Sequence, residues 1–311
     1  MTRCGPKISA ALAVFLIFSI WPAASAQPVG EGPFPVFYGQ AEIFQEAIAR
    51  AEPFRRPGRV TGLIVPHHLL ASDLIARAMA SATGGGYRRI IILGPDHYRR
   101  GRGPFSVPGR DFLSPLGRAT LDRAGAERLL SNPLVSTSNL FSHEHAFQTL
   151  LPFLVHYFPE ARVLPVALSA TSSQNDWDSL FETLRPLLDE ETLLIQSTDF
   201  SHYLKRAAAD LKDAESAEVI MSEDYRAAAG LNQPAHLDSR AALYLQMKAQ
   251  KELGARPRIE QMRNSVHYGA AGEPEADETT SYLLVVYRRP PEIARPDLLP
   301  DKQAAPGQTR R

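Results

Sequence analysis

The stretch RIIILGPDHY, residues 89–98, is an apolar run that gives way at once to a polar loop. Ile90 to Leu93 has the pattern of a strand that is buried on both faces. Gly94 and Pro95 end the run, and Asp96 and His97 follow directly. A buried strand with polar residues at its carboxyl end is typical of an α/β sheet, in which ligands bind at that edge.

Strand and helix patterns alternate on both sides of this stretch. Further strands are expected at 60–65, 162–168, 192–196 and 281–287, and helices at 69–82, 144–158, 177–188, 207–221 and 239–253. The helix at 144–158 should kink at Pro152. The alternation predicts one α/β domain over residues 27–289, with the sheet between helices. Residues 27–36 should form a loose lead-in, and 290–311, rich in Pro and polar residues, a disordered tail.

The N-terminus has the pattern of a secretory signal peptide over residues 1–26. Arg3 and Lys7 flank the start of an apolar run at 8–20, and Ala24-Ser25-Ala26 is a small-x-small cleavage site before Gln27. The predicted location is therefore periplasmic or secreted, without a stable membrane span after cleavage. An uncleaved membrane anchor is the alternative. The single cysteine, Cys4, lies inside this signal, so a metal in the mature chain must be held by His, carboxylate or backbone groups.

The overall charge excludes one class of partner. Lys plus Arg number 34 and Asp plus Glu number 34, so no net positive field favours nucleic acid. Three arginines at 99, 100 and 102 leave room for a local basic patch just after His97.

Three histidines follow predicted strands at their carboxyl ends. These are His67, His97 and His202, and Asp96 and Asp199 lie in the same loops. Imidazole is a common ligand of zinc, copper and iron, and a nearby carboxylate can bind the metal or orient the ring. The loops therefore predict a shared metal site. The alternative is that each histidine only forms hydrogen bonds within its own loop.

A second group, Ser142-His143-Glu144-His145, opens the helix expected at 144–158. Ser142 would cap the helix, and Glu144 and His145 would occupy its first turn. His143 and His145 could donate or accept protons beside a bound metal. The alternative is a capped first turn that faces solvent.

Six motifs in order give the chain a family likeness. They are PHH (66–68), LGPDHY (93–98), SPLG (114–117), EHAFQTLLPFL (144–154), STDFSHY (197–203) and NSVHYGAA (264–271). The series, spanning about residues 60–287, resembles the Memo-like family, whose prokaryotic members are protein B of the AmmeMemoRadiSam system. The resemblance implies a three-layer α/β/α fold with a central mixed sheet, similar to class III extradiol dioxygenases, which have a non-haem metal site.

The resemblance also implies roles for single residues. His67 and His97 match metal-ligand positions, and His202 matches the third site histidine, which is the acid/base position in the dioxygenases. Asp199, Glu144 and His145 match positions that line the same pocket.

One departure from the family concerns a late cysteine that is often a further metal-site residue. Here the segment reads His236-Leu237-Asp238-Ser239. Asp238 would give a set of two histidines and one carboxylate, whereas His236 would give an all-histidine set.

The expected cofactor is one divalent or redox metal ion, with iron or copper favoured and zinc also compatible. Two functions stay open: a non-haem, oxygenase-like oxidoreductase acting on a small molecule, and a non-catalytic metal-binding or scaffold protein with a protein partner. A metal-dependent hydrolase with Glu144 as the base is a third hypothesis.

Overall fold

The computed structural model of the chain describes residues 32–269 and 278–291. The predicted signal peptide and nearly all of the predicted tail lie outside these ranges. Within them, no helix is both long and apolar enough to cross a membrane.

A nine-stranded mixed sheet forms the centre of the described chain, with the order β10-β11-β1-β8-β2-β7-β3-β6 and β9 paired to β11. Its strands are β1 Arg59–Val65, β2 Arg89–Pro95, β3 Phe105–Val107, β6 Val135–Thr137, β7 Arg162–Leu168, β8 Thr192–Ser197, β9 His202–Leu204, β10 Arg256–Asn264 and β11 Thr279–Arg289. A separate hairpin pairs β4 Phe112–Ser114 with β5 Gly117–Ala119.

Four neighbouring strands, β1, β8, β2 and β7, run parallel to one another. Their carboxyl ends therefore lie at one edge of the sheet. They are apolar and buried along nearly their whole length, as strands covered on both faces must be. β11 and β10 pair antiparallel on one side, and β3 pairs antiparallel with β7 on the other, which makes the sheet mixed.

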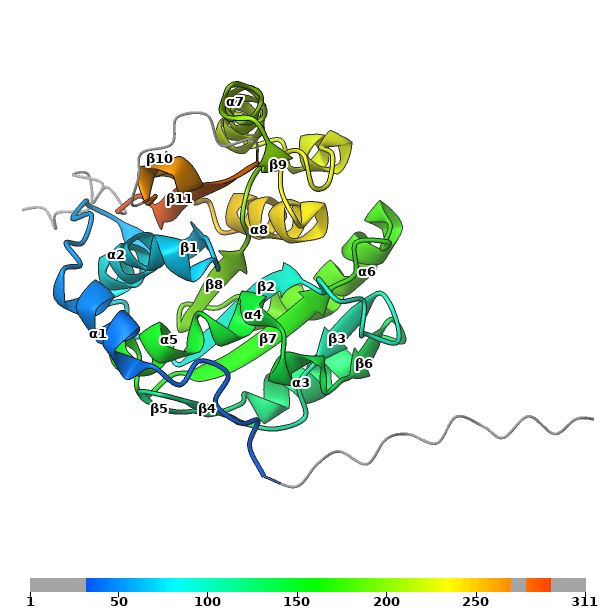
Figure 1. Cartoon of the computed structure of the whole chain (residues 1–311). Coiled ribbons are helices and arrows are strands. Elements are labelled where there is room, and N and C mark those ends of the chain that lie inside the picture. The colour runs from blue at the N-terminus through cyan, green and yellow to red at the C-terminus, as the bar shows by residue number, and fades with distance from the viewer. Residues whose placement is uncertain (1–31, 270–277, 292–311) are drawn as a thin grey trace, which may run out of the picture. The chain divides into compact units, whose positions relative to one another are not determined.

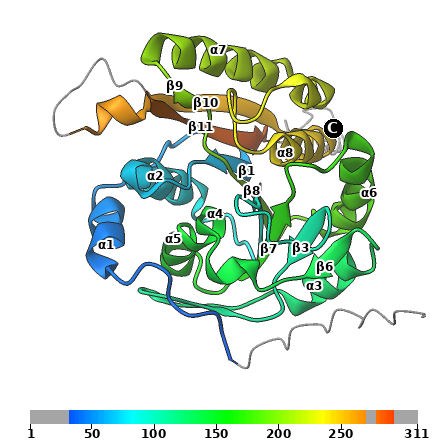
Figure 2. The ribbon, with the colours of Figure 1, turned by 45° about the vertical axis from the view of Figure 1, so that its right-hand side comes forward.

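Helices cover both faces of the sheet (Figures 1 and 2). The α-helices are α1 Ala41–Ala49, α2 Ser72–Ala82, α3 Arg123–Leu130, α4 His145–Gln148, α5 Leu151–Tyr157, α6 Gln174–Leu184, α7 Arg206–Ser222 and α8 Arg240–Glu252. Short 3-10 helices are η1 Leu69–Ala71, η2 Leu140–Ser142, η3 Arg185–Leu187, η4 Tyr225–Gly230 and η5 Ser265–His267.

Alternate residues of each central strand belong to opposite cores, because successive side chains of a strand point to opposite faces. In β2, Ile90 and Ile92 belong to the core that includes residues of α1, α2, α4 and α5, whereas Ile91 and Leu93 belong to the core that includes residues of α3, α6, α7 and α8. The predicted three-layer α/β/α arrangement is therefore confirmed.

The helix expected at 144–158 is two helices, α4 and α5. Pro152 lies in the first turn of α5 and not at a kink, because a first-turn residue needs no backbone N–H donor. Ser142 does not cap α4; the N-cap is Glu144, whose side chain accepts from the Ala146 N–H.

The loose lead-in expected at 27–36 is wrong for the part that the structure describes. Phe34 is fully buried, and its ring centroid lies 5.0 Å from that of Phe112. Its backbone N–H donates to the Asp111 carbonyl at 2.7 Å. The Gly- and Pro-rich composition of this segment did not indicate that one of its aromatic residues packs into the core.

Candidate metal centre

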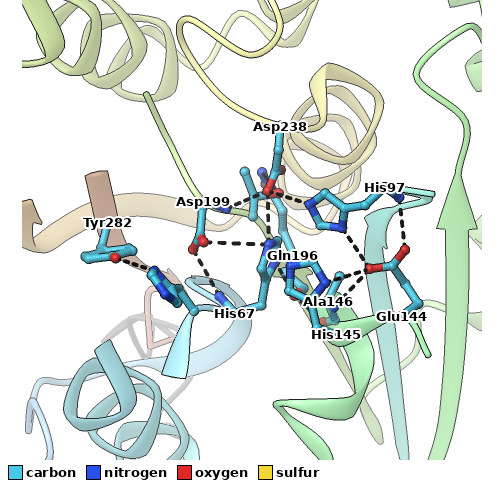
Figure 3. Close-up of polar contacts among 12 residues, drawn as sticks. His67, His97, Glu144, His145, Ala146, Gln196, Asp199, Asp238 and Tyr282 are labelled. Carbon is cyan, nitrogen blue, oxygen red and sulfur yellow. Dashed lines mark hydrogen bonds and ion pairs between the residues drawn. The ribbon is translucent and has the colours of Figure 1, made fainter. Parts of the chain in front are cut away.

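Three polar residues follow neighbouring parallel strands at the same edge of the sheet. His67 comes two residues after β1, His97 two residues after β2, and Asp199 two residues after β8. Because β8 lies between β1 and β2, the three loops converge (Figure 3). His145 joins them from the start of α4, and Asp238 from the segment before α8.

His67, His97 and His145 form a cluster in which each offers one ligand atom, all within 4.8 Å of one another. The His97 and His145 rings stack with centroids 4.3 Å apart, and each lies 5.0 Å from the His67 ring. His67 is only 1% exposed. Three imidazoles at this spacing could hold a metal ion.

Asp238 contacts the two strand-end histidines of this cluster. Its Oδ2 lies 3.1 Å from His67 Nε2 and 3.6 Å from His97 Nε2. Two hydrogen bonds from backbone N–H groups hold it there: Asp199 N donates to Asp238 Oδ2 at 3.0 Å, and Asp238 N donates to the Asp199 carbonyl at 3.1 Å. His67, His97 and Asp238 thus bring together the donor types, two imidazole nitrogens and one carboxylate, that bind iron(II) in many non-haem sites.

His236, the alternative to Asp238, belongs to another contact. Its Nε2 lies 2.6 Å from Glu215 Oε2, and its Nδ1 accepts from the Asn232 N–H at 3.0 Å. Both ring nitrogens are therefore engaged, and His236 is not part of the cluster.

The second nitrogen of each strand-end histidine is held by an oxygen. Ser197 Oγ donates to the Ala146 carbonyl, so it accepts from His67 Nδ1 at 3.1 Å. His97 Nδ1 lies 2.7 Å from Glu144 Oε1, while Glu144 Oε2 accepts from the His97 backbone N–H at 2.9 Å. With hydrogen on Nδ1, both rings turn Nε2, the nitrogen that would bind a metal, toward Asp238, and the partner on Nδ1 fixes the ring as in metal-binding histidines.

The charge balance of the cluster also suits a cation. Burial opposes ionisation of Asp238, but His67 and His97 outweigh it and hold the pKa of that carboxyl well below its usual range. Burial likewise opposes protonation of His97, yet the nearby carboxylates of Asp238 and Glu144 raise its pKa to about 10. Burial also opposes protonation of His67, but the negative charges of Asp199 and Asp238 outweigh it and raise the pKa of His67.

His145 is the neutral member of the cluster. Burial, and then the positive charges of His67 and His97, lower its pKa to about 3. A neutral imidazole keeps a lone pair available for a metal.

Two buried atoms of the site make no hydrogen bond of good geometry with any residue that the structure describes: Asp238 Oδ1, and His67 Nε2, whose neighbour is the Asp238 carboxylate at 3.1 Å. Unsatisfied buried polar atoms are costly and call for an explanation. A metal ion between these side chains would satisfy both, and would replace the protons that His67 and His97 hold in its absence. The residues present therefore fit a metal.

His202, expected as the third site histidine, is not in the three-histidine cluster. The chain beyond Asp199 pairs with other segments: Phe200 bridges to Leu237, and His202 begins β9 beside β11. The ring of His202 lies beside Tyr203, with its Nδ1 buried and without a hydrogen bond to the described residues. His145 takes the third place in the cluster instead.

The other candidates lie at the margin or support the ligands. Asp199 Oδ1 accepts from the His67 backbone N–H at 3.1 Å. His68 is exposed and turns to the Tyr282 hydroxyl, 2.6 Å away. His143 is also exposed and contacts Ser142.

Sequence reasoning missed Ser197 and Tyr98. Both belong to quoted motifs, Tyr98 as the last residue of LGPDHY and Ser197 as the first residue of STDFSHY, and that membership was the available signal.

The chain is similar in sequence to several proteins of the MEMO1 family. A MEMO1 family protein of Thermotoga sp. (strain RQ2) is 30% identical over 172 residues, covering 53% of this chain and 62% of that protein. One from Thermotoga maritima is 29% identical over 189 residues (56% and 68%), and one from Aquifex aeolicus 24% over 257 residues (74% and 64%). The matched region thus spans about six tenths of the length of several such relatives.

A solved structure, an uncharacterized protein of Escherichia coli K12, aligns with a TM-score of 0.49 at 14% identity, covering 74% of this chain and 100% of that one. The family model described as "Memo-like protein" matches residues 41–285, which include every residue of the cluster and Asp238. The chain therefore belongs to the Memo-like family, as its six motifs predicted.

Proposed function

We propose that the chain binds one metal ion through His67, His97 and Asp238 and acts as a non-haem, oxygenase-like oxidoreductase on a small molecule. One observation carries this proposal: Asp238 Oδ2 lies beside the Nε2 atoms of both histidines. Two histidines and one carboxylate suit iron(II) and leave coordination positions open for substrate and oxygen. Iron is therefore favoured, followed by copper and then zinc. When bound, the metal would supply the redox chemistry.

The chain's own residues would prepare this site. Ser197 and Glu144 orient the two histidines through their Nδ1 atoms. Glu144 is fully buried, and both of its carboxylate oxygens already accept hydrogen bonds. It is therefore poorly placed to serve as the base of a hydrolase, which disfavours that alternative.

The alternative of a non-catalytic metal-binding protein is supported by His145. If this neutral imidazole were a fourth ligand beside His67, His97 and Asp238, the protein would supply a closed, four-ligand set, as in structural sites. The two functions thus differ in whether His145 binds the metal. In the catalytic proposal, His145 stands beside an open position and exchanges protons with the substrate.

Metal content tests the proposal. The full-length chain would be purified anaerobically without chelators, beside His67→Ala/His97→Ala, Asp238→Asn, His145→Gln and His202→Gln, and analysed by elemental mass spectrometry. About one metal per chain is expected in the wild type, none in the double variant, and a strong loss in Asp238→Asn. His202→Gln should keep the metal, because His202 is not in the cluster.

The outcome for His145→Gln separates the two functions. A variant that keeps the metal supports an open site and redox chemistry, whereas one that loses it as completely as Asp238→Asn supports the closed, non-catalytic site. If the wild type and the double variant are equally empty even after reconstitution with iron, copper or zinc, the proposal of a metal site is wrong.

We also propose that the protein is exported and acts in the periplasm or outside the cell. The support is the basic, apolar and small-residue pattern of residues 1–26. The intact mass of the protein from fractionated cells tests this proposal: a periplasmic species that begins at Gln27 is expected, and a cytoplasmic species of full mass would contradict it.

A further inference from the structure

The loop that follows His97 carries three exposed arginines, Arg99, Arg100 and Arg102. None of them forms an ion pair with any residue in ranges 32–269 and 278–291. The acidic side chains of the metal site do not neutralise them, because the side chains of Glu144, Asp199 and Asp238 are at most 7% exposed and are engaged with the histidines. The loop therefore presents uncompensated positive charge.

The backbone of this loop is fixed rather than loose. The Asp96 carboxylate accepts from the Arg100 N–H at 3.0 Å and from the Gly101 N–H at 2.7 Å. Gly101 fits closely against the same carboxylate and Ser106, since a Cβ on it would lie 2.8 Å from Ser106 Oγ. Asp96, the only carboxylate in the loop, thus accepts hydrogen bonds from the loop backbone and does not pair with the arginines. The arginine side chains project from a turn whose backbone is already ordered.

Tyr98 connects the arginines to the metal site. Its hydroxyl lies 3.4 Å from His145 Nδ1, and the Arg100 guanidinium lies 5.4 Å from the centroid of its ring. The ring is 52% exposed. The Tyr98 side chain therefore lies between the Arg100 guanidinium and the histidine cluster, and it contacts both.

We infer that Arg100 binds an anionic group of the small molecule that reaches the metal, so that the substrate class is a carboxylate or phosphate compound. This inference rests on the proposed metal site. A guanidinium presents two parallel N–H donors to a carboxylate or phosphate, which fixes orientation as well as charge. Arg99 and Arg102 add to the local field that attracts an anion, and Tyr98 provides an apolar face for the part of the molecule between the anion and the metal.

A matched pair of metal-binding probes isolates the anion. Butyrohydroxamate and succinate monohydroxamate carry the same metal-binding group on four-carbon chains, but only the second ends in a carboxylate. The glutarate and adipate monohydroxamates extend the reach. Dissociation constants would be measured by calorimetry on the metal-loaded, full-length protein at fixed ionic strength, with a phosphonate analogue to compare carboxylate with phosphate.

We expect at least one carboxylated or phosphonate-bearing hydroxamate to bind about tenfold or more tightly than butyrohydroxamate. Arg100→Gln should reduce this ratio to near one and leave the affinity for butyrohydroxamate within about twofold. Arg162→Gln is the matched control, because Arg162 is an exposed arginine at the opposite end of a central strand. It should leave the ratio unchanged.

The outcomes distinguish the inference from the proposed function. If no hydroxamate binds in a metal-dependent way, the proposed site fails, and the inference fails with it. If all of them bind equally in the wild type, or if Arg100→Gln and Arg162→Gln change the ratio alike, the inference is overturned while the metal site stands.

Discussion

At the scale of the residue, two of the three carboxylates near the histidines, Asp238 and Glu144, have different tasks. Asp238 directs an oxygen at both Nε2 atoms, whereas Glu144 holds the opposite side of one ring. The sequence predicts Asp238 as a candidate metal ligand and Glu144 as a candidate acid/base residue. The contacts keep Asp238 among the candidate ligands and make Glu144 a positioning residue.

Glu144→Gln tests this division at a single atom. The variant keeps an acceptor for the His97 backbone N–H but removes the charge that fixes the His97 ring. We expect metal affinity to fall about 10- to 100-fold, as for other partners that orient metal-binding histidines. Metal titration by competition with a chelator would measure the change. Glu182→Gln, an exposed control in α6, should have no effect, and an unchanged affinity in Glu144→Gln would show that Glu144 does not orient the ligand.

At the scale of the element, the site depends on how closely α4 approaches the end of β2. Gly94 permits this approach: a Cβ there would lie 3.1 Å from the Phe147 ring and 3.4 Å from the Ala146 Cβ. Ala146 also accepts from Ser197, which orients His67. The position of one short helix therefore affects all three histidines of the cluster.

Gly94→Ala should displace α4 and disturb the cluster. Overpacking of this kind typically costs about 1–3 kcal/mol, and metal affinity should fall as well, because His145 and Glu144 move with the helix. Urea unfolding and a metal titration would measure the two effects. Gly230→Ala is a suitable control, since nothing lies near its would-be Cβ. A loss of stability without any loss of metal affinity would contradict the proposed coupling.

Asp111 links the N-terminal segment to the β4–β5 hairpin and gives a pH-dependent prediction. Burial opposes its ionisation, but hydrogen bonds from Leu121 and Arg118 outweigh this and lower its pKa. A carboxyl with a lowered folded-state pKa stabilises the fold above the unfolded value near 4, and this contribution is lost as the pH falls through the folded value.

Asp111→Asn should therefore lower the free energy of unfolding by about 1–2 kcal/mol at pH 7, and by progressively less below about pH 4. Urea unfolding at pH 7 and at pH 3 would measure the difference. Asp210→Asn, an exposed control in a helix-surface ion pair, should change stability by less than about 0.5 kcal/mol. An equal loss at both pH values would exclude the charge of Asp111 as the cause.

At the scale of the whole molecule, the site joins parts of the chain that are distant in sequence. His67, His97, His145 and Asp238 come from four segments brought together by the parallel strands and the start of α4. An ion that binds them therefore binds only the folded chain.

Metal should consequently stabilise the entire fold. At a free concentration about 100 times the dissociation constant, the gain is about 2.7 kcal/mol, or about 5–10 °C in Tm for a domain of this size. Differential scanning calorimetry with and without metal would show the shift in the wild type and in Asp210→Asn. The shift should be absent in Asp238→Asn, and an equal shift in that variant would place the binding elsewhere.

The sequence by itself determined the fold class, the family and two candidate ligand positions. Buried strand patterns at 60–65, 89–93 and 192–196, each followed by a polar loop, were sufficient to predict His67 and His97 at one edge of a parallel sheet. These features are local, because the apolar residues of a buried strand and the polar residue that follows the strand occupy consecutive positions in the sequence.

Only the tertiary structure decided between Asp238 and His236, placed His145 rather than His202 in the cluster, and turned Glu144 into a support for His97. It also showed that Phe34 belongs to the core and that Arg100 stands one aromatic ring away from the site. The physical reason is that these assignments depend on side-chain direction and on contacts between segments up to about 170 residues apart, which sequence periodicity does not encode.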